Sequence, residues 1–275
     1  MKTLYISDLD GTLLDANAQL SEYTKTILNH AAEHGVCFSI ATARTAATVA
    51  GLLSGVNIAV PVVLMNGVAV YDLQKSEYLN VCYISAPALL KLLEILSEHN
   101  LTGTMYTVEN GLLTTYYQRV YSARFEKFMQ ERQVVYKKQF VQIDDFDLLR
   151  GRGCVYFSVC ANFESLSPAA GLLEKTDGLH VEFYHDTYAP GYWYMEVCSD
   201  LGSKKNAVDW LRHKYGFKKI VSFGDNLNDL SMFAASDECC AVENAKIQVI
   251  EAATRVIGAN TMDGVAKWLE KTLNI

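Results

Sequence analysis

Two aspartates stand two positions apart, directly after a short apolar stretch near the start of the chain. Residues 4–7 are typical of a buried strand, and Asp8, Asp10 and Gly11 follow at its end. Open α/β sheets bind ligands just outside the carboxyl ends of their strands, so we expect both carboxylates at that edge. Two carboxylates held so close need a cation or a shared proton, and a hard divalent cation such as Mg2+ prefers oxygen ligands. Taken alone, the motif is equally well explained as a turn with a solvated acidic rim.

Polar residues also follow other predicted strands. They are Thr42 after the strand 36–40, Asn66 after the strand 62–65 and Asp225 after the strand 220–223. Helices predicted between the strands complete the alternating pattern of a parallel, doubly wound α/β sheet. Such a sheet would gather these residues beside Asp8, although Thr42 and Asn66 taken singly are typical turn residues.

The composition describes a folded chain that is not expected to bind nucleic acid or a membrane. Its 275 residues suffice for about two domains, and 50% of them are hydrophobic while 20% are charged. The net charge is −7 and no basic run occurs, which argues against a nucleic-acid partner. The uncharged segment Thr45–Tyr71 is interrupted by glycine, proline and asparagine, so it predicts helix, turn and buried strand rather than a membrane span.

Cysteine usage and the N-terminus indicate a compartment. The seven cysteines show no metal-binding spacing such as C-x-x-C, and we expect buried thiols in a reducing environment. Asp8 interrupts the N-terminal apolar stretch too early for a signal peptide. We therefore expect a cytoplasmic protein that is a monomer or a small homo-oligomer.

The middle of the chain has a different pattern of predicted helices and strands from its two ends. Residues 86–99 have the pattern of an amphipathic helix, and Asn110-Gly111 between two β-rich runs predicts a hairpin. Further elements are predicted as helices at 119–131 and 166–176, a strand at 154–160 and a hairpin at 181–197. This pattern suits an α+β domain with an antiparallel sheet. We predict a core domain made of residues 1–83 and 199–275, with a second domain, 84–198, inserted between them.

The order of these motifs resembles the haloacid dehalogenase superfamily, specifically its Cof-type branch (subfamily IIB), over essentially the whole chain. Four motifs carry the resemblance: Asp8-Leu9-Asp10-Gly11-Thr12, Thr42 after a strand, Lys204 in Gly202-Ser203-Lys204, and Gly224-Asp225-Asn226-Leu227-Asn228-Asp229. Three shorter stretches also resemble this branch: Asn66-Gly67-Val68, Glu243-Asn244-Ala245 and Asp263-Gly264-Val265-Ala266. The resemblance implies a Rossmann-like core with an inserted cap domain that determines substrate specificity.

The same resemblance implies an Mg2+-dependent phosphatase acting on small phosphorylated metabolites, in particular sugar phosphates. Asp8 would be the nucleophile that becomes an aspartyl phosphate, and Asp10 would act as acid and then as base. The implied Mg2+ ligands are Asp8, the backbone carbonyl of Asp10, and Asp225, supported by Asp229, Asn66 and Gly11. The implied phosphate-binding groups are Thr42, Lys204, Asn228 and the backbone amides near Leu9 and Ala43.

Two other functions stay open at this point. A phosphomutase on the same scaffold would also use an aspartyl phosphate. A catalytically silent sensor of phosphorylated metabolites would be expected to have lost Asp8, Asp10 or Lys204, and all three are present.

Some positions depart from the family pattern or lie outside it. The family usually has glycine at Ala43 and often at Lys205, so Lys205 leaves open which lysine reaches phosphate, although the match favours Lys204. The tip of the last cap hairpin carries His185 and Tyr188, which would contact substrate if the tip closes over it; a solvated loop is the alternative.

Two further expectations concern ordinary structural roles. We expect Arg44 to form a surface ion pair, with a substrate contact as the alternative. We expect Tyr192-Trp193-Tyr194 to pack within a sheet, with a sugar-binding platform as the alternative.

Overall fold

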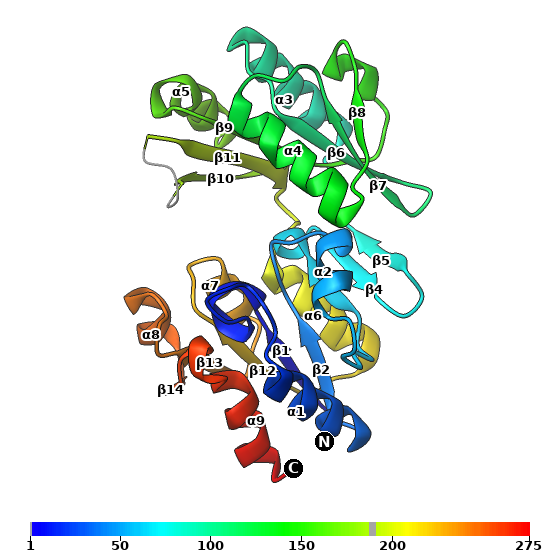
Figure 1. Ribbon diagram of the computed structural model, residues 1–275. Coiled ribbons are helices and arrows are strands. Elements are labelled where there is room, and N and C mark those ends of the chain that lie inside the picture. The colour runs from blue at the N-terminus through cyan, green and yellow to red at the C-terminus, as the bar shows by residue number, and fades with distance from the viewer. Residues whose placement is uncertain (1, 187–190) are drawn as a thin grey trace. The chain divides into compact units, whose positions relative to one another are not determined.

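The computed structural model describes residues 2–186 and 191–275, and the chain divides into two compact units (Figure 1). The core unit contains Met1–Asn80 and Ser203–Ile275, and the inserted unit contains Val81–Gly202. The regular elements of the core unit are β1 (Thr3–Ser7), α1 (Glu22–Glu33), β2 (Cys37–Ile40), α2 (Ala46–Leu52), β3 (Val62–Leu64), β4 (Ala69–Asp72), β5 (Glu77–Val81), α6 (Lys204–Tyr215), β12 (Lys219–Gly224), α7 (Asp229–Phe233), β13 (Glu238–Val242), α8 (Ile247–Ala252), β14 (Arg255–Ile257) and α9 (Gly264–Leu273). Those of the inserted unit are α3 (Ala86–Glu98), β6 (Thr104–Glu109), β7 (Leu112–Tyr117), α4 (Ala123–Tyr136), β8 (Phe140–Gln142), β9 (Cys154–Ala161), α5 (Phe163–Leu173), β10 (Leu179–His185) and β11 (Trp193–Ser199).

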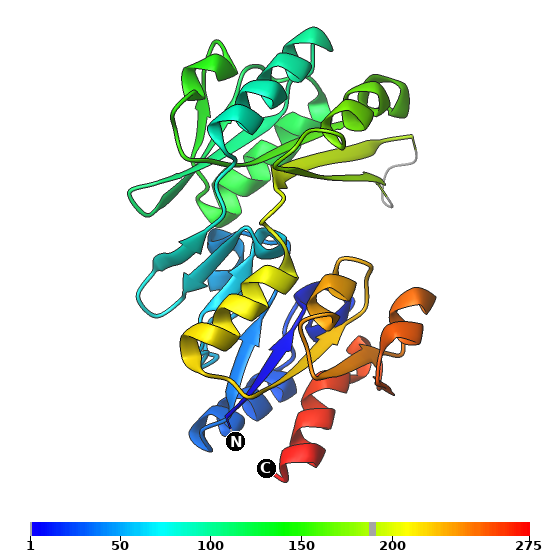
Figure 2. The same cartoon turned by 180° about the vertical axis from the view of Figure 1, so that it is seen from behind.

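Five parallel strands form the main sheet of the core unit, in the order β14-β13-β12-β1-β2. The inner strand β1 lies between β12 and β2, and its side chains Leu4 and Ile6 are fully buried. Helices α1 and α9 cover one face of this sheet and α6 covers the other, as Figures 1 and 2 show together. Covering on both faces explains the continuous apolar runs of these strands, and it confirms the predicted α/β class.

β3 departs from the parallel arrangement that the sequence predicts for it. Val63 pairs in parallel with Ala41 through an isolated bridge, but β3 as a whole pairs antiparallel with β4 in a three-stranded sheet that also contains β5. The cause is the turn after β3, where Met65, Asn66 and Gly67 all have positive φ angles, of 49°, 54° and 100°. This turn reverses the chain immediately, so that the following residues form a neighbouring strand.

The inserted unit is built on a six-stranded sheet in the order β10-β11-β9-β6-β7-β8. All of its pairings are antiparallel except that between β7 and β8. Helices α3 and α5 pack on one face over a buried cluster that includes Leu92, Leu166, Phe157 and Met195. Helix α4 lies on the opposite face of the same sheet (Figures 1 and 2). The unit is therefore α+β, as the alternation of strands and turns predicts.

The bounds of several elements differ from the predicted ones because capping residues begin the helices. α4 begins after Ser122, whose hydroxyl accepts from the backbone N–H of Phe125, so residues 119–121 stay outside the helix. α5 begins after Asn162 in the same way. β8 and β14 have three residues each and were not predicted, since so short a strand carries no readable alternation.

Two observations bear on the expected compartment. All seven cysteines are free, and four of them are buried: Cys154, Cys198, Cys239 and Cys240. Among the described residues, every helix is too short or too polar to cross a membrane.

Candidate functional site

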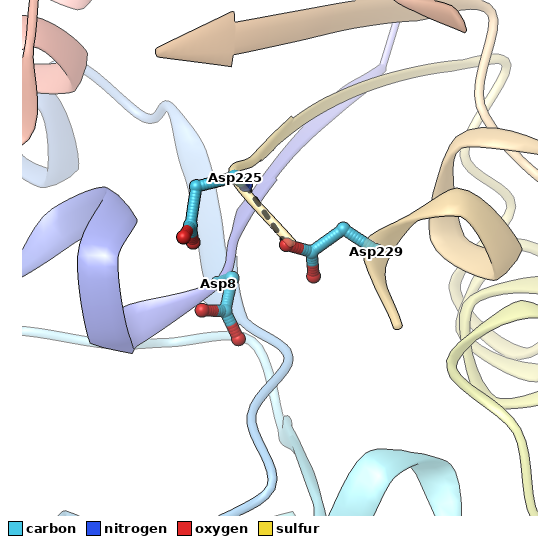
Figure 3. A group of neighbouring side chains, drawn as sticks. All are labelled: Asp8, Asp225 and Asp229. Atoms are coloured by element: carbon cyan, nitrogen blue, oxygen red, sulfur yellow. Dashed lines mark hydrogen bonds between the residues drawn. The ribbon is translucent and has the colours of Figure 1, made fainter. Parts of the chain in front are cut away.

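Two neighbouring strands of the core sheet deliver the central carboxylates. Asp8 follows β1, and its backbone N–H donates to the carbonyl of Phe223 in β12 at 2.9 Å, so the strand pairing extends to the aspartate itself. Asp225 follows the end of β12, and its Oδ1 accepts from the hydroxyl of Thr12 at 2.7 Å. The two carboxylates therefore lie together at the edge of the sheet (Figure 3).

The chain after Asp8 forms a tight turn against Asp225. Asp10 has φ −75° and ψ 118°, and Gly11 has φ 81° and ψ −5°, which are the angles of the two central residues of a type II turn. A Cβ atom at Gly11 would lie 2.5 Å from Oδ2 of Asp225. Gly11 is thus required both for its backbone conformation and for the close approach to Asp225.

A third carboxylate and a lysine complete the buried part of the site. Asp229, at the start of α7, accepts from the backbone N–H groups of Asp225 and Asn226 at 2.9 and 3.0 Å. Its other oxygen accepts from Nζ of Lys204 at 2.7 Å, and the same Nζ donates to Oδ1 of Asp8 at 2.6 Å. The side chain of Lys204 is 1% exposed, so this ammonium lies inside the protein between two carboxylates.

The electrostatics of the cluster follow from burial and from its excess of acidic groups. Burial would lower the pKa of Lys204, but Asp8 and Asp229 outweigh this effect and raise it, so the lysine stays charged. Burial raises the pKa of Asp8 despite the opposing charge of Lys204, and burial raises that of Asp225 to about 6. Three carboxylates facing one ammonium leave negative charge that calls for a further cation.

The donor atoms fit a hard divalent cation such as Mg2+. Asp8, Asp225 and Asp229 each offer an oxygen, and these atoms lie within 4.8 Å of one another. Both oxygens of Asp229 are already engaged, whereas Oδ2 of Asp225 accepts no hydrogen bond from the described residues, and Oδ1 of Asp8 accepts only that from Lys204 and keeps a second lone pair. The geometry therefore leaves Asp8 and Asp225 as available ligands and gives Asp229 the task of fixing the loop and the lysine.

Asp10 is engaged differently from the other aspartates. Nε and Nη2 of Arg44 donate to its two carboxylate oxygens at 2.7 and 2.5 Å. The Asp10 side chain is half exposed, so Arg44 forms an ion pair as expected, but its partner is a predicted catalytic residue. Sequence reasoning missed this partner because no local pattern links a turn after one strand to a loop after the next.

The predicted phosphate-binding groups lie around the same strand ends. Thr42 is fully buried after β2, and its hydroxyl accepts from the backbone N–H of Arg44 at 3.2 Å. The backbone N–H groups of Leu9 and Ala43 have no acceptor among the described residues. Asn228 donates one amide hydrogen to Oδ1 of Asn66 at 3.1 Å, and its own buried Oδ1 has no partner in the described chain.

The turn at Asn66-Gly67 supports this arrangement from the side. A Cβ atom at Gly67 would lie 2.1 Å from the carbonyl of Ser203, so the turn packs directly against the residue before Lys204. Lys204 points into the site, whereas Lys205 pairs with Asp209 on the surface at 2.9 Å. Ala43 is not among the residues with positive φ, so replacing the usual glycine there costs no backbone strain.

Of the two predicted substrate contacts in the inserted unit, only one lies among the described residues. His185 ends β10, is exposed, and has its ring edge-on to Trp193 at 5.7 Å between centroids. Trp193 also packs against Phe183 of β10 and against Phe163 at the start of α5, so it is a packing residue between neighbouring strands and a helix. Tyr188 lies outside the described residues.

Known proteins are similar to this chain in sequence and architecture. Residues 5–269 match the model of the haloacid dehalogenase-like hydrolase family. A protein of Buchnera aphidicola (subspecies Baizongia pistaciae) with a provisional phosphatase name is 28% identical, over 98% of each chain. The pyridoxal phosphate phosphatase YbhA of Escherichia coli (strain K12) is 25% identical, over 95% of each chain. The solved structure of BT4131, a subclass IIB sugar phosphatase of the superfamily, has a TM-score of 0.73 at 19% identity and matches 100% of both chains.

Proposed function

We propose that this chain, which belongs to the haloacid dehalogenase-like hydrolases, works through an aspartyl phosphate on Asp8 with Mg2+ as cofactor. The basis of the proposal is that the chain is a phosphatase of small phosphorylated molecules. One observation carries the proposal. Lys204 fixes one oxygen of the buried Asp8 carboxylate, and the other oxygen accepts no hydrogen bond from the described residues. A carboxylate held on one side and available on the other is suited to attack phosphorus.

The proposed reaction has two steps. Oδ2 of Asp8 forms a bond to phosphorus while the bond from phosphorus to the leaving oxygen breaks, and Asp10 gives that oxygen its proton. Asp10 then accepts a proton from a water molecule that attacks the aspartyl phosphate. This second step releases inorganic phosphate and restores Asp8.

The surroundings of Asp8 supply positive charge and hydrogen-bond donors. Mg2+, held by Asp8, Asp225 and the carbonyl of Asp10, would offset the repulsion between an anionic nucleophile and an anionic substrate. Lys204 keeps one N–H beyond the two that Asp8 and Asp229 accept, and this donor would reach a phosphoryl oxygen. Thr42, Asn228 and the N–H groups of Leu9 and Ala43 are the further donors that we assign to the phosphoryl group.

Replacement of the nucleophile tests the proposal. Asp8→Asn keeps the shape of the side chain but makes it a poor nucleophile, so release of inorganic phosphate should stop while the fold is retained. Acid-quenched wild-type protein should carry one phosphoryl group on the peptide that contains Asp8, as detected by mass spectrometry. Asp209→Asn removes a surface carboxylate that pairs with Lys205 and serves as the matched control. A folded Asp8→Asn protein with near wild-type turnover would rule out the covalent mechanism.

We further propose that the substrates are sugar phosphates or comparably small phosphate esters in the cytoplasm, and that the inserted domain, 84–198, selects among them. The names of BT4131 and YbhA, a sugar phosphatase and a pyridoxal phosphate phosphatase, support a small phosphate monoester. A panel of sugar phosphates, nucleotides and cofactor phosphates, assayed with Mg2+ and with a chelator, identifies the best substrate. His185→Ala should then lower kcat/KM for that substrate and spare a small aryl phosphate.

A further inference from the structure

Two asparagines outside the proposed catalytic set hold the turn that follows β1. Nδ2 of Asn244 donates to the carbonyl of Gly11 at 2.8 Å, and its Oδ1 accepts from the backbone N–H of Asn260 at 2.9 Å. Nδ2 of Asn260 in turn donates to the carbonyl of Leu14 at 2.8 Å. The side chains therefore anchor two carbonyls of the turn to one another and to the chain after β13.

The same chain segment also holds the loop that carries Asp225. The backbone N–H of Lys246, two residues after Asn244, donates to the carbonyl of Asp225 at 2.9 Å. This segment follows β13, the strand next to β12. It thus contacts both the turn after β1 and the loop after β12, and fixes their separation from outside the sheet.

The turn after β1 and the loop that carries Asp225 are already in close contact. Gly11 approaches Asp225 so closely that even a Cβ atom would lie 2.5 Å from its carboxylate. The carbonyl of Asp10 belongs to the peptide directly before Gly11, so a shift of Gly11 also redirects this oxygen. A displacement of the turn would therefore change the distance between two oxygens that must contact one ion.

We propose that Asn244 is a positioning residue that sets the spacing of the Asp10 carbonyl and Asp225, and thereby the affinity of the site for Mg2+. This inference rests on the proposed function, since it assumes that these oxygens hold Mg2+. Asn244 touches neither the substrate phosphate nor the ion: it acts through Gly11. Outer contacts of this kind typically change metal affinity because they orient the ligands.

The chain offers a matched control for this hydrogen-bond pattern. Nδ2 of Asn29 donates to the carbonyl of Gly55 at 2.8 Å, and its Oδ1 accepts from the backbone N–H of Asn57 at 2.7 Å. Asn29 thus makes the same two kinds of contact as Asn244, to a glycine carbonyl and an asparagine N–H, but it holds no residue of the proposed site. Its replacement removes equivalent bonds from the same unit.

The experiment measures Mg2+ binding by calorimetry on metal-free protein, alongside kcat/KM. Asn244→Ala should weaken Mg2+ binding by ~10–100-fold, as expected for an outer contact of a metal ligand. Asn29→Ala should leave the Mg2+ dissociation constant unchanged while lowering Tm to a comparable extent. Wild-type Mg2+ affinity in a folded Asn244→Ala protein would overturn the inference.

A second variant tests the hydrogen bond from Asn244 to Gly11 by itself, and it replaces Asn244→Ala if that variant does not fold. Asn244→Asp keeps the shape and the acceptor for Asn260, but it replaces the donor to Gly11 by an oxygen. It should weaken Mg2+ binding as Asn244→Ala does, and unchanged binding would overturn the role of the Gly11 contact. If wild-type protein binds no Mg2+, the metal assignment fails together with this inference; if it binds normally and both variants match it, the inference alone fails.

Discussion

Asp10 forms an ion pair with Arg44, although its proposed role requires it to deliver a proton. Arg44 donates two hydrogen bonds to the carboxylate, one to each of its oxygens. The Asp10 side chain is half exposed, so water can replace Arg44 at the carboxylate. We infer that the pair opens during each catalytic cycle, and that Arg44 holds Asp10 between cycles.

Substitution of Asp10 separates these roles. Asp10→Asn should lower turnover of an alkyl phosphate by roughly 10²–10⁴, the usual contribution of a positioned acid and base. The loss should be smaller for an aryl phosphate, whose leaving group needs no proton. Arg44→Gln removes the ion pair but keeps the carboxyl group, so it is the control. If Asp10→Asn lowered turnover equally on the alkyl and the aryl phosphate, and Arg44→Gln lowered it to the same extent, Asp10 would have a structural role only.

At the scale of single residues, sequence reasoning located the groups that lie together at the proposed site but not all of the contacts between them. The motif positions Asp8, Asp225, Asp229 and Lys204 lie together, since strand ends of a parallel sheet meet at one edge. The contacts of Asn244 with Gly11 join segments more than two hundred residues apart. Such partners depend on the details of tertiary packing, which no local spacing encodes.

At the scale of elements, the turn after β1 is constrained in two ways. It combines a positive φ at Gly11 with close contact to the Asp225 carboxylate. Gly67, with a φ of 100° and a Cβ position 2.1 Å from the carbonyl of Ser203, is constrained in the same two ways, whereas Gly35 has only the positive φ. Gly35 has a φ of 75°, and a Cβ atom there would meet nothing within 4 Å.

This contrast gives a prediction with an internal control. Both Gly11→Ala and Gly35→Ala should lower stability by about 1–2 kcal/mol, because an L-residue is strained at positive φ. Gly11→Ala should in addition reduce kcat/KM by ~10–100-fold, since its Cβ displaces a proposed metal ligand. Thermal unfolding measures the loss of stability expected in both variants, and steady-state kinetics measures the loss of kcat/KM expected only in Gly11→Ala. Equal activity of the two variants would show that the site tolerates movement of Asp225.

The elements themselves were predicted best where one signal dominates. The Asn110-Gly111 hairpin and the helix after Ser203 have distinctive turn and capping residues, and both form. β3 keeps one parallel bridge to the chain after β2, as predicted, but otherwise pairs antiparallel with β4 because three consecutive positive φ angles, two of them in non-glycine residues, reverse the chain. Backbone conformations of this kind are stabilised by the surrounding structure, and the local sequence pattern does not predict them.

At the scale of the whole molecule, a buried acid in the inserted unit makes stability depend on pH. Glu196 lies half-buried on the sheet and accepts from the hydroxyl of Tyr156 at 2.8 Å. Burial, reinforced by nearby Glu182, raises the pKa of Glu196 from 4.5 to about 7, although hydrogen bonds from Tyr156 and other hydroxyls oppose the shift. The folded chain therefore holds this proton more tightly than the unfolded chain does.

The sign of the pH dependence follows from linkage. Because the pKa of the folded state is the higher one, the contribution of Glu196 is most favourable below pH 4.5 and is lost as pH rises through about 7. Glu196→Gln cannot ionise, so it should raise Tm above that of the wild type at pH 8 and flatten this part of the Tm profile. Glu98→Gln, at an exposed position of the same unit, is the control. A wild-type profile in Glu196→Gln would contradict the assignment.

The division of the core unit has a consequence for how the chain is made on the ribosome. β1 pairs with β2, which is synthesised soon afterwards, and with β12, which emerges only after the entire inserted unit. The inserted unit is contiguous and can therefore fold while one edge of β1 still lacks its neighbour. An unpaired edge of an apolar strand is prone to associate with other chains. The nascent protein thus carries an exposed, aggregation-prone edge for most of its synthesis, and the Asp8 site is assembled only after β12 has emerged and paired with β1.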